Sequence, residues 1–122
     1  VSTPVQLAAP ELLRRGADVR RQIQDRVRRN LARCGELVAN HPACTLLHAE
    51  GGWYAVVRVP TLMPEEELML RLLNDHHVLA HAGYFFDFAT ESYLIVSLLP
   101  AEPVFDAGVA CVLACAEQAP GA

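Results

Sequence analysis

Apolar residues recur at helical spacing along residues 19–38, and this stripe limits the possible folds more than any other feature. The stripe runs through Val19, Ile23, Val27, Leu31, Cys34 and Val38. These positions lie on one face of a helix, because an α-helix makes one turn in about 3.6 residues. Asp18 can cap this helix, and Pro42 ends it. The sequence therefore predicts a long amphipathic helix whose apolar face packs against another layer.

A shorter helix precedes the long one. Ser2 and Thr3 followed by Pro4 are typical of a helix start, since a hydroxyl side chain can cap the first turn and proline is tolerated there. Gly16 closes this segment. Residues 1–40 are thus expected to be helical almost throughout.

From residue 45 onward the sequence pattern is typical of strands. Residues 45–49 are predicted as one strand, and Gly51 and Gly52 follow as a turn, because glycine allows positive φ angles. Residues 53–59 alternate between two faces, one of which carries Trp53, Ala55, Val57 and Val59. This pattern predicts an antiparallel hairpin.

A third helix is predicted from Pro64. Proline and the three glutamates at 65–67 suit a first helical turn, where the macrodipole favours negative charge. The expected buried stripe of this helix consists of Leu68, Met69, Leu72 and Leu73. The helix is expected to end with Asn74 and Asp75, and a short strand through Val78 and Leu79 to follow.

The remaining residues predict a glycine-led aromatic loop at 81–88, an apolar strand at 93–99 and a last helix at 104–117. The apolar face of this helix carries Phe105, Val109, Val112, Leu113 and Ala116. The element order is helix, helix, strand, strand, helix, strand, strand, helix. It favours the α+β class, as a two-layer sandwich in which helices cover one face of a small antiparallel or mixed sheet.

Charge is distributed unevenly along the chain. Residues 1–40 hold eight of the ten arginines with four acids, and residues 41–122 hold two arginines with ten acids. The acids interleaved among these arginines favour a solvated helix face, so we expect no nucleic-acid partner. No uncharged stretch approaches the roughly 20 apolar residues of a membrane span, and the N-terminus has no secretory pattern. We therefore expect no membrane partner and a cytoplasmic location.

Cysteine and histidine spacings give little support for a metal site. The cysteines fit neither paired zinc ligands nor a disulfide framework, and we interpret them as buried free thiols: Cys34, Cys44, Cys111 and Cys115. Cys111 and Cys115 share a helical face, yet no histidine is assigned beside them, so they are read as small core residues. His77 and His81 would lie about 13 Å apart on the expected strand, and together with His76 they are interpreted as solvated or hydrogen-bonded histidines. No metal site is expected.

Six segments stand out together, in the order residues 2–6, the arginine-rich helix, residues 50–54, the glutamate-led helix, residues 83–86 and residues 93–99. Over nearly the whole chain they resemble the C-terminal small domain of class I/II, fold-type I aminotransferases, which depend on pyridoxal phosphate. The resemblance implies that residues 1–40 form a helical connector to a large cofactor domain that this chain lacks. Residues 41–122 would then be the small domain.

The resemblance also implies that two segments rich in glycine and aromatic residues approach a substrate channel. The candidates are Gly51, Gly52, Trp53, Tyr54, Gly83, Tyr84 and Phe85. Judged from the residues alone, Tyr84, Phe85, Phe86 and Phe88 either line a ligand site or fill the core. Ile95 aligns with the arginine that clamps the substrate carboxylate in many relatives, so we expect that clamp to be absent.

All ten basic side chains other than histidine are arginines, and the chain has no lysine. The family's cofactor forms an imine with a lysine of the large domain, whereas arginine stays protonated and cannot do so. We therefore expect no catalytic residue in this chain and no bound pyridoxal phosphate.

The parent enzyme would carry the cofactor and transaminate an amino donor, and we expect a homodimer. Val1 in place of a starting methionine favours a cut or processed fragment. The alternative hypothesis is a stand-alone ligand-binding or regulatory α+β module that dimerises.

Overall fold

The structure is a computed structural model that describes residues 1–90 and 92–118. The last four residues of the small domain expected at 41–122 lie outside the described residues. The elements are α1 (Thr3–Arg15), α2 (Ala17–Val38), β1 (Thr45–Leu46), β2 (Tyr54–Arg58), α3 (Glu65–His76), β3 (His81–Ala82), the 3₁₀ helix η1 (Gly83–Phe86), β4 (Tyr93–Ser97) and α4 (Glu102–Ala116). The predicted order of helices and strands is confirmed.

The four strands form an antiparallel sheet in the order β1-β2-β4-β3. In the central pair, Tyr54 lies opposite Ser97 and Val56 lies opposite Ile95. The hairpin predicted from the glycine turn is the β1–β2 pair, with Thr45 opposite Arg58. The predicted α+β fold class is therefore confirmed, and its sheet is antiparallel.

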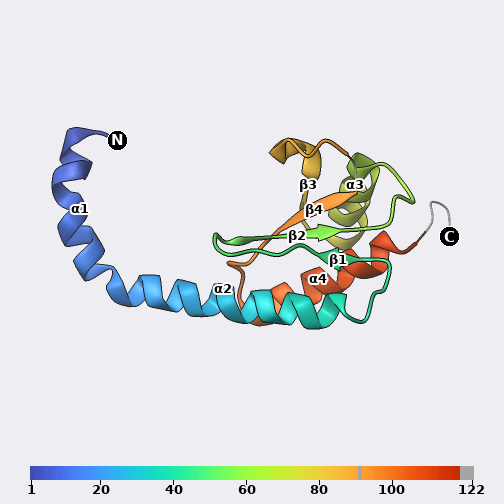
Figure 1. Cartoon of the computed structure of the whole chain (residues 1–122), viewed down its shortest axis with the longest axis horizontal. Helices are drawn as coiled ribbons and strands as arrows, with labels where there is room; N and C mark the ends of the chain where they lie inside the picture. The colour runs from blue at the N-terminus through green and yellow to red at the C-terminus, as the bar shows by residue number, and fades with distance from the viewer. Residues whose placement is uncertain (91, 119–122) are drawn as a thin grey trace.

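Helices α2 and α4 pack side by side on one face of this sheet (Figure 1). The strands present Ala55, Val57, Leu94 and Val96 to that face, and all four are buried. From α4 the core receives the five apolar residues predicted for its buried face: Phe105, Val109, Val112, Leu113 and Ala116. Because side chains alternate along a strand, the intervening residues point to the opposite face.

Strand β3 lies three residues later than predicted. The backbone of His77 is left-handed, with a φ of 57°, and ends α3, while the Val78 N–H donates to the Leu72 carbonyl over 2.9 Å. The chain between 77 and 80 is therefore a connection, and Leu79 is exposed. The predicted strand through Val78 and Leu79 is wrong, because this helix cap determines where pairing with β4 begins.

Four smaller predictions also need correction. Leu73 of the expected α3 stripe is exposed, whereas Leu68 and Leu72 are buried. Trp53 precedes β2 and is exposed, so it does not share the buried face of that strand. Asp18 lies inside α2, where it pairs with Arg21 and does not cap the helix. Strand β1 is limited to two residues of the predicted 45–49.

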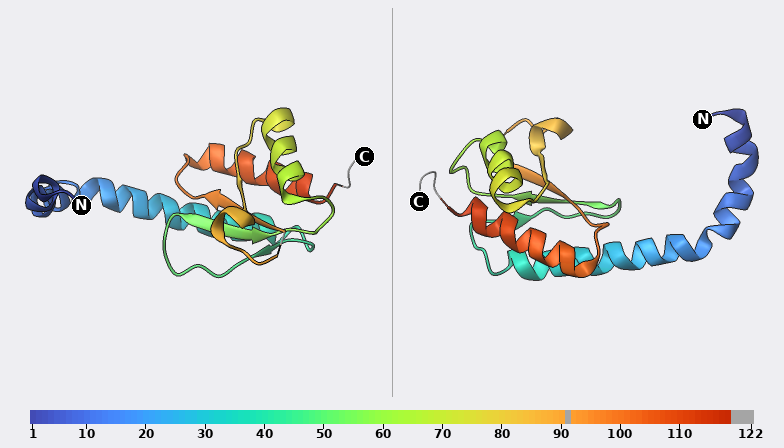
Figure 2. Two further views of the ribbon diagram at one scale, coloured as in Figure 1. Left: turned by 90° about the horizontal axis from the view of Figure 1, so that it is seen from above. Right: turned by 180° about the vertical axis from the view of Figure 1, so that it is seen from behind.

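The long N-terminal arm is only partly covered (Figure 2). Helix α1 buries no residue, and the apolar stripe of α2 changes along its length. Val19 is 60% exposed and Ile23 is also exposed, whereas Cys34 is fully buried and Val38 nearly so. The helix predicted from this stripe is therefore confirmed, but the rest of the described chain covers only its second half.

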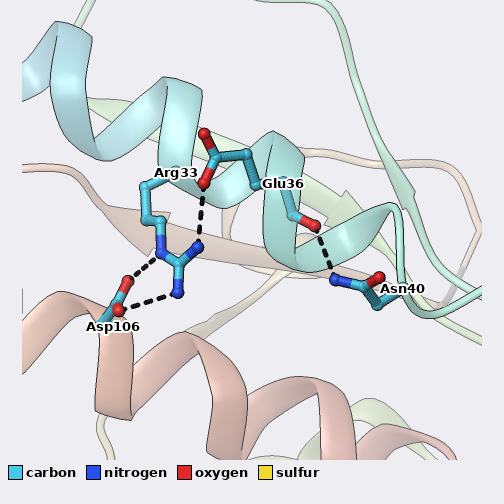
Figure 3. A network of polar contacts seen from close by, with 4 residues as sticks. All are labelled: Arg33, Glu36, Asn40 and Asp106. Atoms are coloured by element: carbon cyan, nitrogen blue, oxygen red, sulfur yellow. Dashed lines mark hydrogen bonds and ion pairs between the residues drawn. The ribbon is translucent and has the colours of Figure 1, made fainter.

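Polar contacts join α2 to α4 (Figure 3). Arg33 donates to Asp106 through Nε over 2.7 Å and through Nη2 over 3.0 Å, and its Nη1 also donates to Glu36 over 2.9 Å. This bidentate contact holds the pKa of Asp106 below its usual range. Arg29 pairs with Glu102 over 2.7 Å. Part of the arginine excess in residues 1–40 therefore serves helix packing.

Asn30 is the buried polar residue that ties α2 to the exit of β4. Its Nδ2 donates to the carbonyl oxygens of Leu98 and Pro100, each over 2.9 Å. These carbonyls follow the strand and have no ladder partner in the sheet. The side chain therefore provides hydrogen bonds where the sheet ends and α4 has not yet begun.

We predict that Asn30→Ala lowers the free energy of unfolding by about 2 kcal/mol, because two carbonyls lose their buried donor. Urea unfolding followed by circular dichroism measures the change. The matched control is Asn40→Ala, since Asn40 donates to the Glu36 carbonyl over 3.1 Å in an exposed position. The control should change stability by less than about 0.5 kcal/mol. Equal effects of the two substitutions would contradict this role of Asn30.

Candidate functional site

The two glycine-aromatic segments predicted from sequence meet on the sheet face that points away from α2 and α4. The ring centroids of Tyr54 and Phe86 lie 5.9 Å apart with the rings edge to face, and Trp53 follows at 6.1 Å from Tyr54. Segments about thirty residues apart in the chain thus form one surface, because β2 and β3 both pair with β4.

His81 extends this surface toward η1. Its ring lies 6.2 Å from Phe86 and 6.5 Å from Phe85, and Tyr84 packs on Phe85 at 4.3 Å. We call these six side chains the aromatic face: Trp53, Tyr54, His81, Tyr84, Phe85 and Phe86. All six are exposed, Trp53 by 53%. They therefore form a surface and do not fill the core, whereas half-buried Phe88 packs on Tyr93 at 4.6 Å.

The turn before β2 lies beside α2. Gly52 has a φ of 85°, a conformation that favours glycine, whereas a Cβ on Gly51 would meet no atom within 4 Å. Both glycines and Tyr54 line a pocket of about 310 Å³ whose other wall includes Val27 and Arg28 of α2. The predicted turn thus borders a small cavity that adjoins the aromatic face through Tyr54.

Gly83 is required by close packing. A Cβ at this position would lie 2.9 Å from the Cβ of Tyr93 and 3.3 Å from Glu65 Oε1. Such a contact is too short for carbon atoms, so an alanine would push η1 away from β4. The glycine therefore allows the aromatic loop to pack directly on the sheet.

Glu65 holds this loop in place. Its carboxylate is buried at the start of α3, where Oε1 accepts the Tyr93 N–H over 2.7 Å and Oε2 accepts the Tyr84 N–H over 3.4 Å. The sequence suggested only a favourable charge in the first helical turn. Glu65 also bridges α3, η1 and β4, because it bonds residues that lie 19 and 28 positions later in the chain. The sequence pattern does not reveal such distant contacts.

Ile95 lies on the same side of the sheet as Tyr54 and is 2% exposed. It sits between Val56 and His81 in the ladder. The side chain is therefore covered in this structure and offers no charge to a carboxylate. His81, which lies opposite Ile95 in the ladder, is a site residue that the sequence does not predict, although alternation along β3 points it to the Ile95 face.

A second cluster lies away from the aromatic face. His76, Cys111 and Cys115 each bring one potential ligand atom within 4.8 Å of the other two. The sequence had placed no histidine beside these cysteines, because His76 approaches α4 only through the packing of α3. Three of the four predicted buried thiols are buried, and Cys111 is half-buried.

The residues of this chain do not by themselves fit covalent pyridoxal phosphate. Imine formation needs an amine side chain, and the sequence has no lysine. The arginines cannot replace it, since they remain protonated.

No helix among the described residues is long and apolar enough to cross a membrane.

We predict that Glu65→Ala lowers the free energy of unfolding by about 2 kcal/mol and loosens the aromatic face, because two backbone N–H groups lose their buried acceptor. Chemical denaturation measures the first effect, and hydrogen exchange at the amides of Tyr84 and Tyr93 measures the second. Glu66→Ala, an exposed neighbour in the same helical turn, is the control and should leave both unchanged. Unchanged exchange in Glu65→Ala would refute the proposed anchor.

No protein-family model matches the sequence, and no curated protein matches it either. Solved structures do match. An aromatic aminotransferase from Pyrococcus horikoshii OT3 aligns with 82% of this chain at 14% identity and a TM-score of 0.70. A methionine aminotransferase from Escherichia coli aligns with 93% of it at 22% identity and a TM-score of 0.68.

An α-aminoadipate aminotransferase from Thermus thermophilus aligns with 88% of the chain at 18% identity and a TM-score of 0.68. The chain spans only 27%, 31% and 29% of the lengths of these three proteins. At such identities the likeness establishes the fold. The chain therefore has the fold of the small domain of fold-type I aminotransferases, as its resemblance in sequence predicted.

Proposed function

We propose that the chain is the small domain of an aminotransferase that depends on pyridoxal phosphate, and that it is not catalytic alone. Residues 1–40 are the connector to a large domain, and residues 41–122 are the small domain. The parent protein transaminates an amino donor, and this domain contributes one wall of its active site. The observation that carries the proposal is the convergence of the two predicted glycine-aromatic segments in one exposed aromatic face.

The composition of the aromatic face supports its role as a channel wall. Ligand sites are mostly apolar and aromatic, with a few polar groups that fix orientation. Here the tyrosine hydroxyls and His81 are the polar groups among exposed rings. Six exposed rings together would be unfavourable on a surface that always faces water. In the proposal, Gly51, Gly52, Trp53, Tyr54, Gly83, Tyr84 and Phe85 border the substrate channel.

The uncovered part of the connector supports a missing partner domain. Val19 and Ile23 continue the stripe that is buried farther along α2, and Leu7, Leu12 and Leu13 of α1 are also exposed. Burial of these side chains would stabilise a contact by roughly 25 cal/mol per Å² of apolar surface. A large domain of the same parent would cover them.

In the proposal, the large domain holds the pyridoxal phosphate and supplies its lysine. The cofactor provides the electron sink for the chemistry, while this chain shapes the space beside it. Ile95 at the expected clamp position means either that another residue of the parent binds the substrate carboxylate, or that the parent accepts amino donors of a different kind. A homodimer in the cytoplasm is part of the same proposal.

The alternative is a stand-alone ligand-binding or regulatory module that dimerises. Exposed apolar residues on α1 favour it too, because a second copy could cover them as well as a large domain could. The two hypotheses differ in what precedes Val1 in the gene. A large domain with a strand-linked lysine supports the aminotransferase, and a start codon directly before Val1 would exclude it.

We predict that the protein expressed from the complete reading frame shows the absorbance band of a protein-bound imine with pyridoxal phosphate and converts an amino acid to its keto acid. The 122-residue chain should show neither, since it has no lysine. Absorbance titration with the cofactor and a keto-acid assay test both proteins side by side. An imine band in the 122-residue chain would overturn the proposal.

We predict that Trp53→Ala in the complete protein raises KM for the amino donor by on the order of 10-fold, because an apolar contact to the substrate is lost. Steady-state kinetics measure the effect. The matched control is Leu79→Ala, an exposed apolar residue away from the aromatic face. If both substitutions leave KM unchanged, Trp53 does not border the channel.

A further inference from the structure

Helices α3 and α4 pack against each other, and His76, Cys111 and Cys115 form a cluster between them. The two cysteines are one helical turn apart on α4, so their thiols project from the same side. His76 is the last residue of α3, and the left-handed His77 turns the chain away directly after it. Helices α3 and α4 thus bring all three side chains together.

The spacing of the three side chains suits a small ion. A tetrahedral Zn²⁺ bound at about 2.3 Å by sulfur and about 2.0 Å by nitrogen places two sulfurs about 3.8 Å apart and sulfur and nitrogen about 3.5 Å apart. The observed ligand atoms all lie within 4.8 Å of one another. These distances must shorten by at most about 1.3 Å on binding, and rotation of the exposed His76 side chain can shorten those that involve its ring nitrogen.

Burial is graded across the cluster. Cys115 is buried, Cys111 is half-buried and His76 is exposed. His76 and Cys111 also line an apolar groove of about 590 Å³ that Val104, Gly108 and Leu79 border on other sides. An ion can therefore enter from solvent past His76, and its fourth position is left to water or to a group bound in the groove.

The charges around the cluster suit a cation with two thiolates. Burial raises the pKa of the Cys115 thiol, and the charge and hydrogen bond of Cys111 raise it further. Asp75 acts in the same direction, whereas Arg71 opposes it. A bound dication would neutralise the two thiolates that form when the cysteines lose their protons.

We propose that His76, Cys111 and Cys115 form a Zn²⁺ site that fastens the end of α3 to α4. Two thiolates and one imidazole select a borderline-soft ion such as Zn²⁺ over Mg²⁺ or Ca²⁺, which prefer oxygen ligands. On binding, each cysteine forms a sulfur–metal bond and releases its proton, so one Zn²⁺ displaces two protons while the imidazole binds in its neutral form. The site is separate from the aromatic face.

The test is titration of the reduced 122-residue chain with Co²⁺, a spectroscopic substitute for Zn²⁺, under anaerobic conditions. We expect one Co²⁺ per chain, with a sulfur-to-cobalt charge-transfer band and the visible bands of a tetrahedral ion. Zn²⁺ should then abolish these bands by displacing Co²⁺. Zn²⁺ should also raise the melting temperature, since only the folded chain brings the ligands together.

His76→Asn and Cys111→Ser should each weaken Zn²⁺ binding by more than about 100-fold, because losing a direct ligand costs more than losing a supporting group. The matched controls are His77→Asn, which removes the adjacent imidazole and suits the left-handed backbone, and Cys34→Ala, which removes a buried thiol elsewhere. Both should bind as the unchanged chain does. Circular dichroism confirms that each variant is folded.

Three results would overturn the site. The first is a reduced chain that gives no thiolate charge-transfer band. The second is equal Zn²⁺ affinity in His76→Asn, Cys111→Ser and the unchanged chain, because the ion would then bind elsewhere, for example at His41 and Glu117, which lie 2.9 Å apart. The third is failure of Zn²⁺ to displace Co²⁺ from the reduced chain.

Discussion

The antiparallel pairing of β2 with β4 is the interaction on which the rest of the structure depends. It brings residues 54–58 against residues 93–97 in a register that sends Val57 and Leu94 to the helices and Tyr54 and Ile95 to the opposite face. Shifting either strand by a single residue would exchange the two faces of that strand and expose its core residues. The same pairing positions β3, and through it η1, so the aromatic face is a direct consequence of this register.

Periodicity predicted the parts of the fold that depend on neighbours in sequence. The buried face of α4, the long stripe of α2 and the β1–β2 hairpin all follow from spacings of 3.6 or two residues. Strand β3 was misplaced, because its position depends on the left-handed cap at His77. Glu65 and the approach of His76 to Cys111 and Cys115 could not be predicted, since each contact joins elements that come together only through tertiary packing.

The domain has two contrasting ends. On one side, α2 and α4 share a buried core and are joined by the Arg33–Asp106 contact. On the other side, the aromatic face and the first turns of α2 expose apolar side chains that the described chain does not cover. This distribution is expected of a domain whose exposed apolar side chains are buried by a second domain. The chain spans under a third of each similar aminotransferase, which agrees with that interpretation.

The central claim is that the aromatic face is a wall of an active site formed with a large domain. The most direct measurement is a crystal structure of the protein from the complete reading frame, with pyridoxal phosphate and an amino-donor analogue bound. We expect the analogue to lie between the cofactor and Tyr54 or Phe86, and Val19 and Ile23 to be buried by the large domain. An aromatic face turned toward solvent, with the analogue bound elsewhere, would contradict it.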